Sequence, residues 1–305
     1  MTSNLTARPP LNLNQSNEPF QLVLITGISG SGKSVALAVL EDSGYYCVDN
    51  LPAHFLPQIA EFLSVQGYRK AAISIDARSG QSVSSLPEYL QAFLVAGVDV
   101  RLLFLEARSE ILVKRFSETR RKHPLSHGEL TVAECIELER EQLADVVSGA
   151  HRIDTSDMKA NQLRTWVKLV VGVEKSQLTL IFQSFGFKHG LPLDADLVFD
   201  ARALPNPHYD PLLRPLTGKD KPVADFLSNT PSVIAFKADI QAFVEKWLPS
   251  FVEENRSYLT VAIGCTGGQH RSVFLVEELA AYFSGANKVL IRHREQQDYR
   301  SLPTK

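Results

Sequence analysis

The sequence is poor in cysteine, methionine and tryptophan, and it lacks any long apolar run. Its 305 residues include three cysteines, Cys47, Cys135 and Cys265, with neither a CxxC pair nor a metal-ligand spacing. This small number of thiols fits a protein of a reducing compartment better than a disulfide scaffold. We therefore expect a cytoplasmic protein. No apolar stretch approaches the roughly 20 residues of a membrane-spanning helix, so we expect no membrane partner.

The chain also lacks an excess of charge of either sign. Its formal net charge is −2, so any nucleic acid or membrane surface would have to bind a local patch. The apolar fraction of 44% suffices for real cores. Residues 1–19 are polar and rich in Asn and Pro, without the apolar centre of a signal peptide, and we predict a disordered leader there.

Short apolar runs alternate with longer amphipathic stretches along the rest of the chain. This alternation predicts βαβ units around mostly parallel sheets, and therefore an α/β fold. One set of units ends with an expected closing helix at 157–171, and a second set begins near Leu178. We therefore predict two α/β domains, residues 20–172 and 173–305.

A glycine-rich stretch, TGISGSGKSV at 26–35, follows the apolar run 22–25. It satisfies the pattern GxxxxGK[ST] between an expected strand and an expected helix. Its glycines let backbone N–H groups point at phosphate oxygens, and the following helix adds its positive end. Lys33 would neutralise the β and γ phosphates, and Ser34 would ligate Mg²⁺. We predict that nucleotide is bound by Gly27, Ile28, Ser29, Gly30, Ser31, Gly32, Lys33 and Ser34.

Two carboxylates end apolar runs near this loop. Asp76 follows the run 71–75 and Asp49 follows 45–48, where an acidic residue can hold Mg²⁺ or orient a nucleophile. Turn capping is the alternative role for each. Lys33, Asp49 and Asp76 are therefore the candidate catalytic residues. Since no NKxD sequence is present, adenine and guanine both stay open.

An arginine-rich stretch, RFSETRRKHPLS at 115–126, lies downstream. It is either a set of lid arginines, as in small P-loop kinases, or a solvated helix face.

A second small-residue loop, CTGGQHRS at 265–272, also lies between an expected strand and an expected helix. Such a loop presents backbone donors to an anion, and Arg271 adds a fork matched to phosphate. The spacing Cx₅RS also occurs in cysteine-dependent phosphatases, although Gly264 stands where these usually have His. A phosphatase, a phosphate receptor and a plain buried cysteine all stay open. The long Pro-rich loop 201–222 favours the receptor, since it concentrates Arg202, Asn206, His208 and Arg214.

Several strings, in order, resemble the RapZ/YvcJ family over about residues 20–294: SGSGKSVAL, YYCVDNLP, SFGFKHG, LPNPH, RPLTG and NRSYLTVAIGCTGG-HRSV. The resemblance implies a P-loop kinase-like N-terminal domain and a second α/β domain, with weak ATPase and GTPase activity. It implies that ATP binds at 27–34, and that GTP contacts the segment Asp76, Ala77, Arg78 and Ser79.

In the family's adapter branch, the resemblance further implies that the C-terminal domain senses glucosamine-6-phosphate and presents a small RNA to an endoribonuclease. The implied phosphosugar site comprises Asp200, His208, Cys265, Thr266, Gly267, Gly268 and Arg271. This chain departs from that branch at its end. Residues 286–305 hold five Lys or Arg with Glu295 and Asp298 interleaved, instead of a dense basic tail, which weakens the expectation of RNA binding.

The leading expectation is a cytoplasmic, homo-oligomeric regulator. It would use ATP, GTP and Mg²⁺, hydrolyse nucleotide slowly, and sense a phosphorylated amino sugar. One alternative is a small-molecule kinase in which Asp49 positions the acceptor and Arg120 and Arg121 close as a lid. The other is an RNA adapter in which the nucleotide is only structural.

Overall fold

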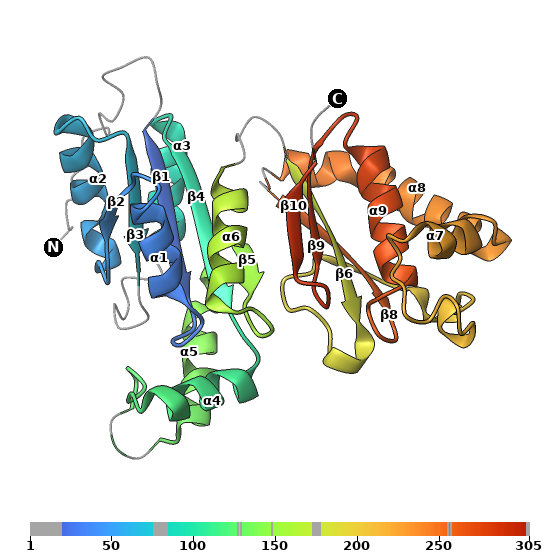
Figure 1. Ribbon diagram of the computed structural model, residues 1–305. Coiled ribbons are helices and arrows are strands. Elements are labelled where there is room, and N and C mark those ends of the chain that lie inside the picture. The colour runs from blue at the N-terminus through green and yellow to red at the C-terminus, as the bar shows by residue number, and fades with distance from the viewer. Residues whose placement is uncertain are drawn as a thin grey trace, which may run out of the picture. The chain divides into compact units, whose positions relative to one another are not determined.

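The computed structural model describes residues 20–75, 85–126, 128, 130–147, 149–172, 178–254, 256 and 258–302. The predicted leader 1–19 and the predicted contact segment 76–79 lie outside these residues. By its contacts the chain divides into two compact units, residues 1–156 and 157–305. Each unit is described by itself (Figure 1).

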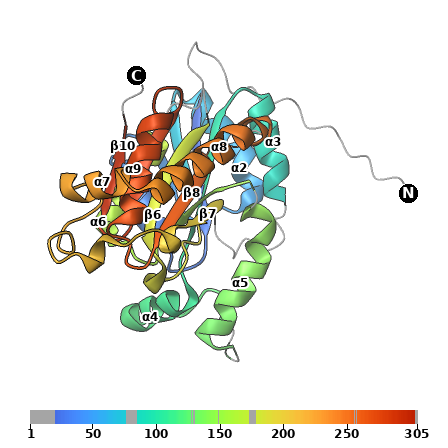
Figure 2. The same ribbon diagram turned by 90° about the vertical axis from the view of Figure 1, so that its right-hand side faces the viewer.

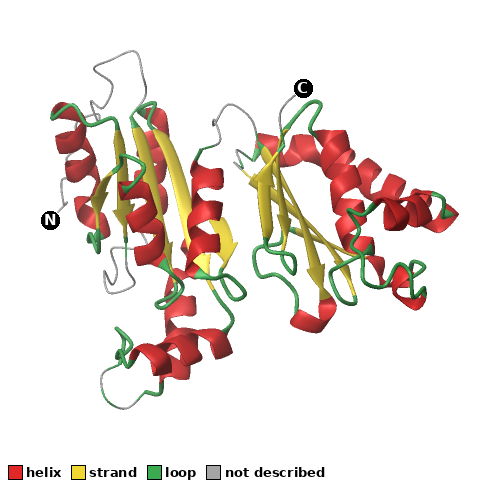
Figure 3. Ribbon diagram, in the orientation of Figure 1, coloured by secondary structure: helices red, strands yellow, loops and turns green. Residues whose placement is uncertain are grey.

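The described part of the first unit contains a five-stranded sheet with the order β2-β3-β1-β4-β5, in which every pair is parallel (Figure 3). Its strands are β1 (Gln21–Gly27), β2 (Tyr46–Val48), β3 (Lys70–Ser74), β4 (Asp99–Glu106) and β5 (His151–Asp154). The central strands are buried on both faces, which explains why they read as unbroken apolar runs. Because all five strands are parallel, their carboxyl ends lie at one edge of the sheet.

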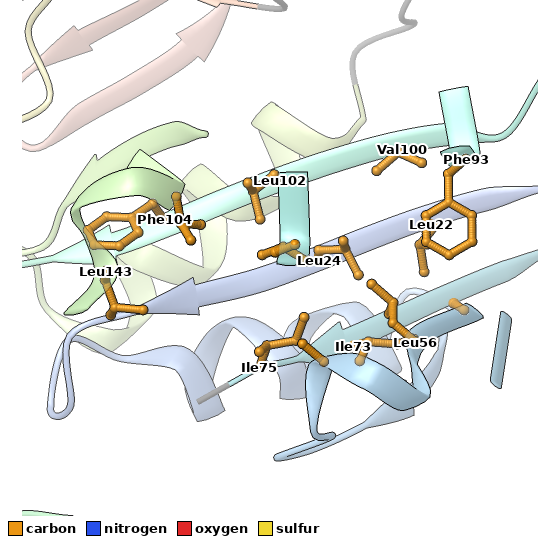
Figure 4. Close-up of a cluster of buried hydrophobic side chains, with 14 of the residues drawn as sticks. Leu22, Leu24, Leu56, Ile73, Ile75, Phe93, Val100, Leu102, Phe104 and Leu143 are labelled. Carbon is orange, nitrogen blue, oxygen red and sulfur yellow. The ribbon is translucent and has the colours of Figure 1, made fainter. Parts of the chain in front are cut away.

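Helices cover both faces of this sheet. The helices in the described part of this unit are α1 (Lys33–Glu41), α2 (Leu56–Val65), α3 (Leu86–Val95), α4 (Ser109–Thr119) and α5 (Val132–Val147), with a short 3₁₀ helix, η1 (Ala53–Phe55), and α4 packs on α5. Figure 4 shows Leu22 and Leu24 of β1 in one core cluster with Leu56 of α2, Phe93 of α3 and Leu143 of α5. Helix α1 packs against β1, β2 and β3. In Figures 1 and 2, α4 and part of α5 extend beyond the carboxyl edge of the sheet.

The described part of the second unit contains another five-stranded sheet, with the order β10-β9-β6-β8-β7. Its strands are β6 (Thr179–Gly186), β7 (Leu197–Asp200), β8 (Tyr258–Cys265), β9 (Lys288–His293) and β10 (Asp298–Ser301). Only the β9–β10 pair among these is antiparallel. The helices of this unit are α6 (Ala160–Val171), α7 (Lys221–Ser228), α8 (Pro231–Glu253) and α9 (Arg271–Phe283), with the 3₁₀ helices η3 (Phe187–His189), η4 (Ala201–Ala203) and η5 (Pro207–Tyr209).

The predicted fold class, two α/β domains with the first built on a parallel sheet, is confirmed. Among the helices in the described ranges, none is long and apolar enough to cross a bilayer.

The two compact units differ from the two domains expected from the sequence in the placement of helix α6. The sequence pattern made it the closing helix of the first domain, whereas its contacts group it with the second unit. The ring of Trp166 lies 5.8 Å from that of Tyr299 on β10, and the Tyr258 hydroxyl donates to the Val170 carbonyl at 2.8 Å. The expected boundary at 172 and the division after Ser156 therefore differ by the length of this helix.

These contacts predict how two fragments behave. A fragment of residues 157–305 should unfold cooperatively, and its thermal midpoint should exceed that of residues 173–305 by about 10 °C or more. The reason is that the shorter fragment lacks the buried Trp166, whose loss alone is a large core deletion. Circular dichroism melts of both fragments test this, and equal midpoints would contradict the assignment of α6 to the second unit.

Candidate functional site

The loop 27–34 connects β1 to α1 at the carboxyl edge of the first sheet. Gly27 has φ 135°, and a Cβ there would lie 2.0 Å from the carbonyl oxygen of Leu105 on β4. Gly32, directly before α1, has φ 110°, in the left-handed region. Glycine is therefore required at Gly27 by both close approach and conformation, and at Gly32 by conformation.

Lys33 and Ser34 stand at the mouth of this loop. Lys33 opens α1, and its Nζ donates to the Gly27 carbonyl at 2.6 Å, across the turn. Ser34 is exposed. The predicted phosphate-binding and Mg²⁺-binding groups thus lie together on one short segment.

A buried carboxylate holds the loop from the side of α5. The oxygens of Glu139, which is fully buried, accept from the Ser29 backbone amide at 2.7 Å and from the Ser29 hydroxyl at 2.8 Å. His123 Nε2 lies 3.2 Å from the same carboxylate. Because His123 Nδ1 accepts from the Leu125 amide, Nε2 carries the proton and donates to Glu139. Ser29 is thereby tied to α5 and to the segment before it.

Two further contacts hold loop carbonyls. Arg115 on α4 donates from Nη1 to the Gly30 carbonyl at 3.1 Å and from Nη2 to the Thr155 carbonyl at 2.6 Å. The Thr155 hydroxyl donates to the Ser31 carbonyl at 2.8 Å. Since a peptide unit is planar and trans, fixing the Ser31 carbonyl points the Gly32 N–H in the opposite direction. Of the arginines in the stretch 115–126, Arg115 is thus an anchor of the loop.

The carboxylates near the loop differ in their availability. Asp49 follows β2 and is exposed, beside Asn50 with φ 54°. Asp76 lies outside the described residues. Glu106 ends β4 and is buried, with Oε1 2.6 Å from Arg152 Nη2 and Oε2 3.3 Å from Arg140 Nη1. Burial raises the pKa of Glu106, while Arg152 and Arg140 oppose this rise. Its ion pairs make Glu106 a structural group.

In the second loop, Cys265 ends β8 and its sulfur faces hydrogen-bond partners. The sulfur lies 3.2 Å from the Ser272 hydroxyl and accepts from the Gly268 amide at 3.2 Å. Burial alone would raise the pKa of the Cys265 thiol, but hydrogen bonds from Ser272 and Gly268 and the charge of Arg271 bring it below its ordinary value. The loop therefore stabilises negative charge at its base.

Arg271, at the start of α9, is largely committed to the neighbouring loop. Its Nη1 donates to the carbonyls of Arg202 and Leu204, each at 2.9 Å, and its Nη2 donates to the Thr266 hydroxyl at 3.3 Å. Asp200 is likewise engaged, because Arg202 donates to both of its oxygens, and this bonding lowers the pKa of Asp200.

The remaining predicted residue on that side, His208, lies in η5. Its ring centroid is 6.3 Å from that of His270. The structure thus brings the predicted phosphosugar residues around one loop, but several of them fix the loop's own shape.

A cavity of about 270 Å³ lies on the other side of the same loop. It is lined by Asp157, Lys188, His189, Gly267, Gln269, Arg294, Glu295 and Gln297. Of these, only Gly267 belongs to the predicted site. The signal available in the sequence was the string SFGFKHG at 184–190, which covers the end of β6 and the 3₁₀ helix η3 with Lys188 and His189.

The C-terminal arginines are internally paired. Arg292 is buried and its Nη1 lies 2.6 Å from Asp194 Oδ2. Arg294 is also buried, with Nε 3.1 Å from Asp157 Oδ2. Arg300 pairs with Glu277 and Asp298. Three of the five cations in the tail therefore have carboxylate partners within the unit.

Two family models match the chain. One, described as the RapZ-like N-terminal domain, matches residues 20–175, and the other, described as the RapZ C-terminal domain, matches residues 178–297. Their border falls close to the boundary expected from the sequence and not at the division between the compact units.

Curated relatives match over nearly their whole length. A protein of Thiobacillus denitrificans named "Nucleotide-binding protein" is 59% identical over 275 residues, which cover 90% of this chain and 99% of the relative. A protein of the same name from Chromobacterium violaceum is 60% identical, with coverage of 90% and 98%.

Solved structures resemble about half of the chain. Shikimate kinase from Bacteroides thetaiotaomicron covers 50% of this chain and 98% of its own, at 12% identity and a TM-score of 0.35. A gluconokinase from Sinorhizobium meliloti covers 51% and 94%, at 15% identity and the same score. At these values the likenesses carry no argument about what this chain does.

The Glu139 contacts predict a difference between two substitutions. Glu139→Gln can keep all three contacts, because its oxygen can accept from the Ser29 amide and His123 while its NH₂ donates to the Ser29 hydroxyl. Glu139→Ala leaves three buried donors without this acceptor, the Ser29 amide, the Ser29 hydroxyl and His123 Nε2, and should lower the free energy of unfolding by about 2–5 kcal/mol. Urea unfolding of both variants measures this, and equal losses in the two would contradict the role given to these hydrogen bonds.

Proposed function

This chain belongs to the RapZ-like family, and we propose that it is a regulator that binds ATP or GTP with Mg²⁺ at residues 27–34. In this proposal the nucleotide is hydrolysed slowly, and the second unit senses a phosphorylated amino sugar. The curated relatives carry a name that points to nucleotide binding, and this supports the first part of the proposal.

The proposed nucleotide site is supported by the directions in which the polar groups of the loop 27–34 point. Protein partners take up the carbonyls of Gly30 and Ser31, and Lys33 Nζ lies at the mouth. The hydroxyl of Ser31 is buried without a partner among the described residues. Fixed carbonyls, a glycine N–H pointing the opposite way and a lysine at a helix start suit a chain of phosphates.

Mg²⁺ fits this site as a nucleotide-borne ion. The described residues contain no group of three or more His, Cys, Asp or Glu that could hold a metal by themselves. Mg²⁺ commonly takes one or two protein ligands together with phosphate oxygens, and Ser34 provides an exposed hydroxyl for this purpose.

Slow hydrolysis follows from the carboxylates at this edge. Glu106 is held by two arginines, and Asp154 accepts from the amide and hydroxyl of Ser156. Neither is placed to activate water. Asp49 and Asp76 are the candidates for activating the attacking water.

For the second unit, we favour a phosphate receptor over a phosphatase. A phosphatase needs the full arginine fork to stabilise the transferring phosphoryl group. In this chain Arg271 Nη1 is already bonded to two backbone carbonyls. The internally paired tail arginines also give little support to an RNA-binding tail, so RNA, an endoribonuclease and self-association stay predictions.

The proposed location is the cytoplasm. Cys47, Cys135 and Cys265 are all unpaired, and Cys265 sits in a loop whose hydrogen bonds stabilise the thiolate. A reducing compartment preserves such thiols.

Lys33→Ala tests the nucleotide site. Removing this charge should reduce ATP hydrolysis by at least about 100-fold while the melting temperature stays near that of the unaltered chain. The control is Lys114→Ala on α4, whose side chain is 71% exposed and forms an ion pair with Glu118 on the same helix. Unchanged hydrolysis in Lys33→Ala, or an equal loss in the control, would refute the assignment. A labelled product in excess over protein, upon adding acceptor sugars, would favour the kinase alternative.

Cys265→Ser tests whether the second loop is a receptor. A receptor needs no thiol chemistry, so this variant should bind a hexosamine phosphate within a few fold of the unaltered chain. The unaltered chain should not turn over an aryl phosphate above background. Cys47→Ser is the matched control. A phosphatase rate that disappears with Cys265→Ser and persists with Cys47→Ser would make this unit an enzyme.

A further inference from the structure

Three cations follow one another directly after α4. The helix ends at Thr119, and Arg120 turns the chain with φ 52°, in the left-handed region. Arg120, Arg121 and Lys122 are all exposed, and we call them the cationic segment. The segment lies between α4 and α5, in the part of the first unit that extends beyond the carboxyl edge of its sheet (Figures 1 and 2). Because these residues lie past the end of the helix, they do not form a solvated helix face.

The cationic segment differs from the neighbouring cations in its lack of carboxylate partners. On α4 Lys114 pairs with Glu118, and on α5 Arg140 lies 3.8 Å from Glu137. Among the residues that the structure describes, no carboxylate pairs with any of the three cations of the segment. Adjacent positive charges repel one another, so the segment is suited to an anion with several charges. Charge alone does not say which anion, and the anchor of the segment supplies that information.

The anchor is a buried histidine at the next position. His123 is 2% exposed, and its ring centroid lies 5.1 Å from that of Phe116 on α4. Its Nδ1 accepts from the Leu125 amide at 3.2 Å, and its Nε2 lies 3.2 Å from Glu139 Oε2. Both ring nitrogens are therefore engaged, and the chain is fixed directly after the three exposed cations.

This anchor shares its partners with the 27–34 loop. The same oxygen, Glu139 Oε2, accepts from the Ser29 amide at 2.7 Å and lies next to His123 Nε2. A second link is apolar, because a Cβ built on Gly30 would lie 3.3 Å from Cε2 of Phe116. Only one side chain thus separates His123 from loop positions 29 and 30, on a polar path and on an apolar path. A cationic segment for a distant polyanion would not need this buried connection to the loop.

We propose that the cationic segment contacts the phosphate oxygens of the nucleotide bound at 27–34, and that His123 is the positioning residue that holds the segment beside the loop through Glu139. The inference rests on the proposed nucleotide site. Guanidinium and ammonium groups are matched to phosphate oxygens, as hydrogen-bond donors and as charges. Lys33 belongs to the loop itself, whereas the position of the segment depends on α4 and α5.

The contact is tested by titrating the full chain with a fluorescent ATP analogue and competing with ATP and with inorganic tripolyphosphate. A triple variant, Arg120→Gln with Arg121→Gln and Lys122→Gln, removes three charges at exposed side chains. It should weaken ATP and tripolyphosphate by the same factor, at least about tenfold, because phosphate contacts are lost and base contacts are not. The matched control is Lys114→Gln on the neighbouring helix, which should change both affinities by less than about twofold.

The role of His123 is tested by a double-mutant cycle. If His123 acts through the segment, the triple variant should cost at least about tenfold in tripolyphosphate affinity in the unaltered chain, but less than about threefold in a His123→Ala chain. His123→Gln keeps an N–H donor for Glu139 and should restore most of the effect of the triple variant. A purely structural role for His123 would lower the melting temperature and leave the two factors multiplicative, which would overturn its assignment.

The failures of this inference and of the nucleotide site are distinguishable. If the triple variant binds tripolyphosphate as the unaltered chain does, the contact is absent and the inference is wrong, while the nucleotide site stands. A loss of affinity for ATP alone also overturns it. Should His123→Ala fail to fold, the triple variant still decides, since its changes are all at exposed side chains. If the unaltered chain binds neither ATP nor tripolyphosphate, the nucleotide site fails, and this inference fails with it.

Discussion

The carboxylate of Glu139 is the contact on which the shape of the 27–34 loop depends. It accepts two hydrogen bonds from Ser29 and one from His123, in a fully buried position. Arg115 and Thr155 hold the next two carbonyls. The loop is thus fixed from outside by α4, α5 and the end of β5, so its polar interior does not need a ligand to keep its form. Preorganisation of this kind reduces the cost of binding, because few groups remain to be ordered.

The second unit uses the same geometry for a different purpose. Its loop after β8 also joins a parallel strand to a helix, but the arginine that follows is turned toward the carbonyls of Arg202 and Leu204. The Arg271 guanidinium therefore links two loops of the protein, instead of presenting both of its Nη groups to a ligand. The cavity on the other side of the loop is lined by charged residues, among them Lys188, Arg294 and Glu295.

The sequence predicted the parts of this structure that are local. Strand, glycine turn and helix are adjacent at 21–41, so the loop could be located from its pattern alone. Glu139 is 110 positions from Ser29, and no local pattern connects them. A signal was nevertheless present, since Glu139 falls on the buried face of α5 with Ile136, Leu143 and Val146. A glutamate on an apolar helical stripe indicates a buried partner without identifying it. The sequence showed Arg292 and Arg294 only as cations of a diluted tail, whereas in the structure both are buried on the β9–β10 hairpin beside carboxylate partners. Helix α6 shows the same limit, because periodicity predicts a helix but not the sheet it covers.

The central claim is that the 27–34 loop binds the phosphates of a nucleotide. The most direct measurement is an equilibrium titration of the full chain with a fluorescent ATP analogue and Mg²⁺, followed by competition. The account predicts saturation at one nucleotide per chain, and displacement by ATP, GTP and inorganic tripolyphosphate but not by adenosine, since the loop contacts phosphate and not base. Displacement by adenosine as effective as by ATP, or no saturable binding at millimolar nucleotide, would contradict it.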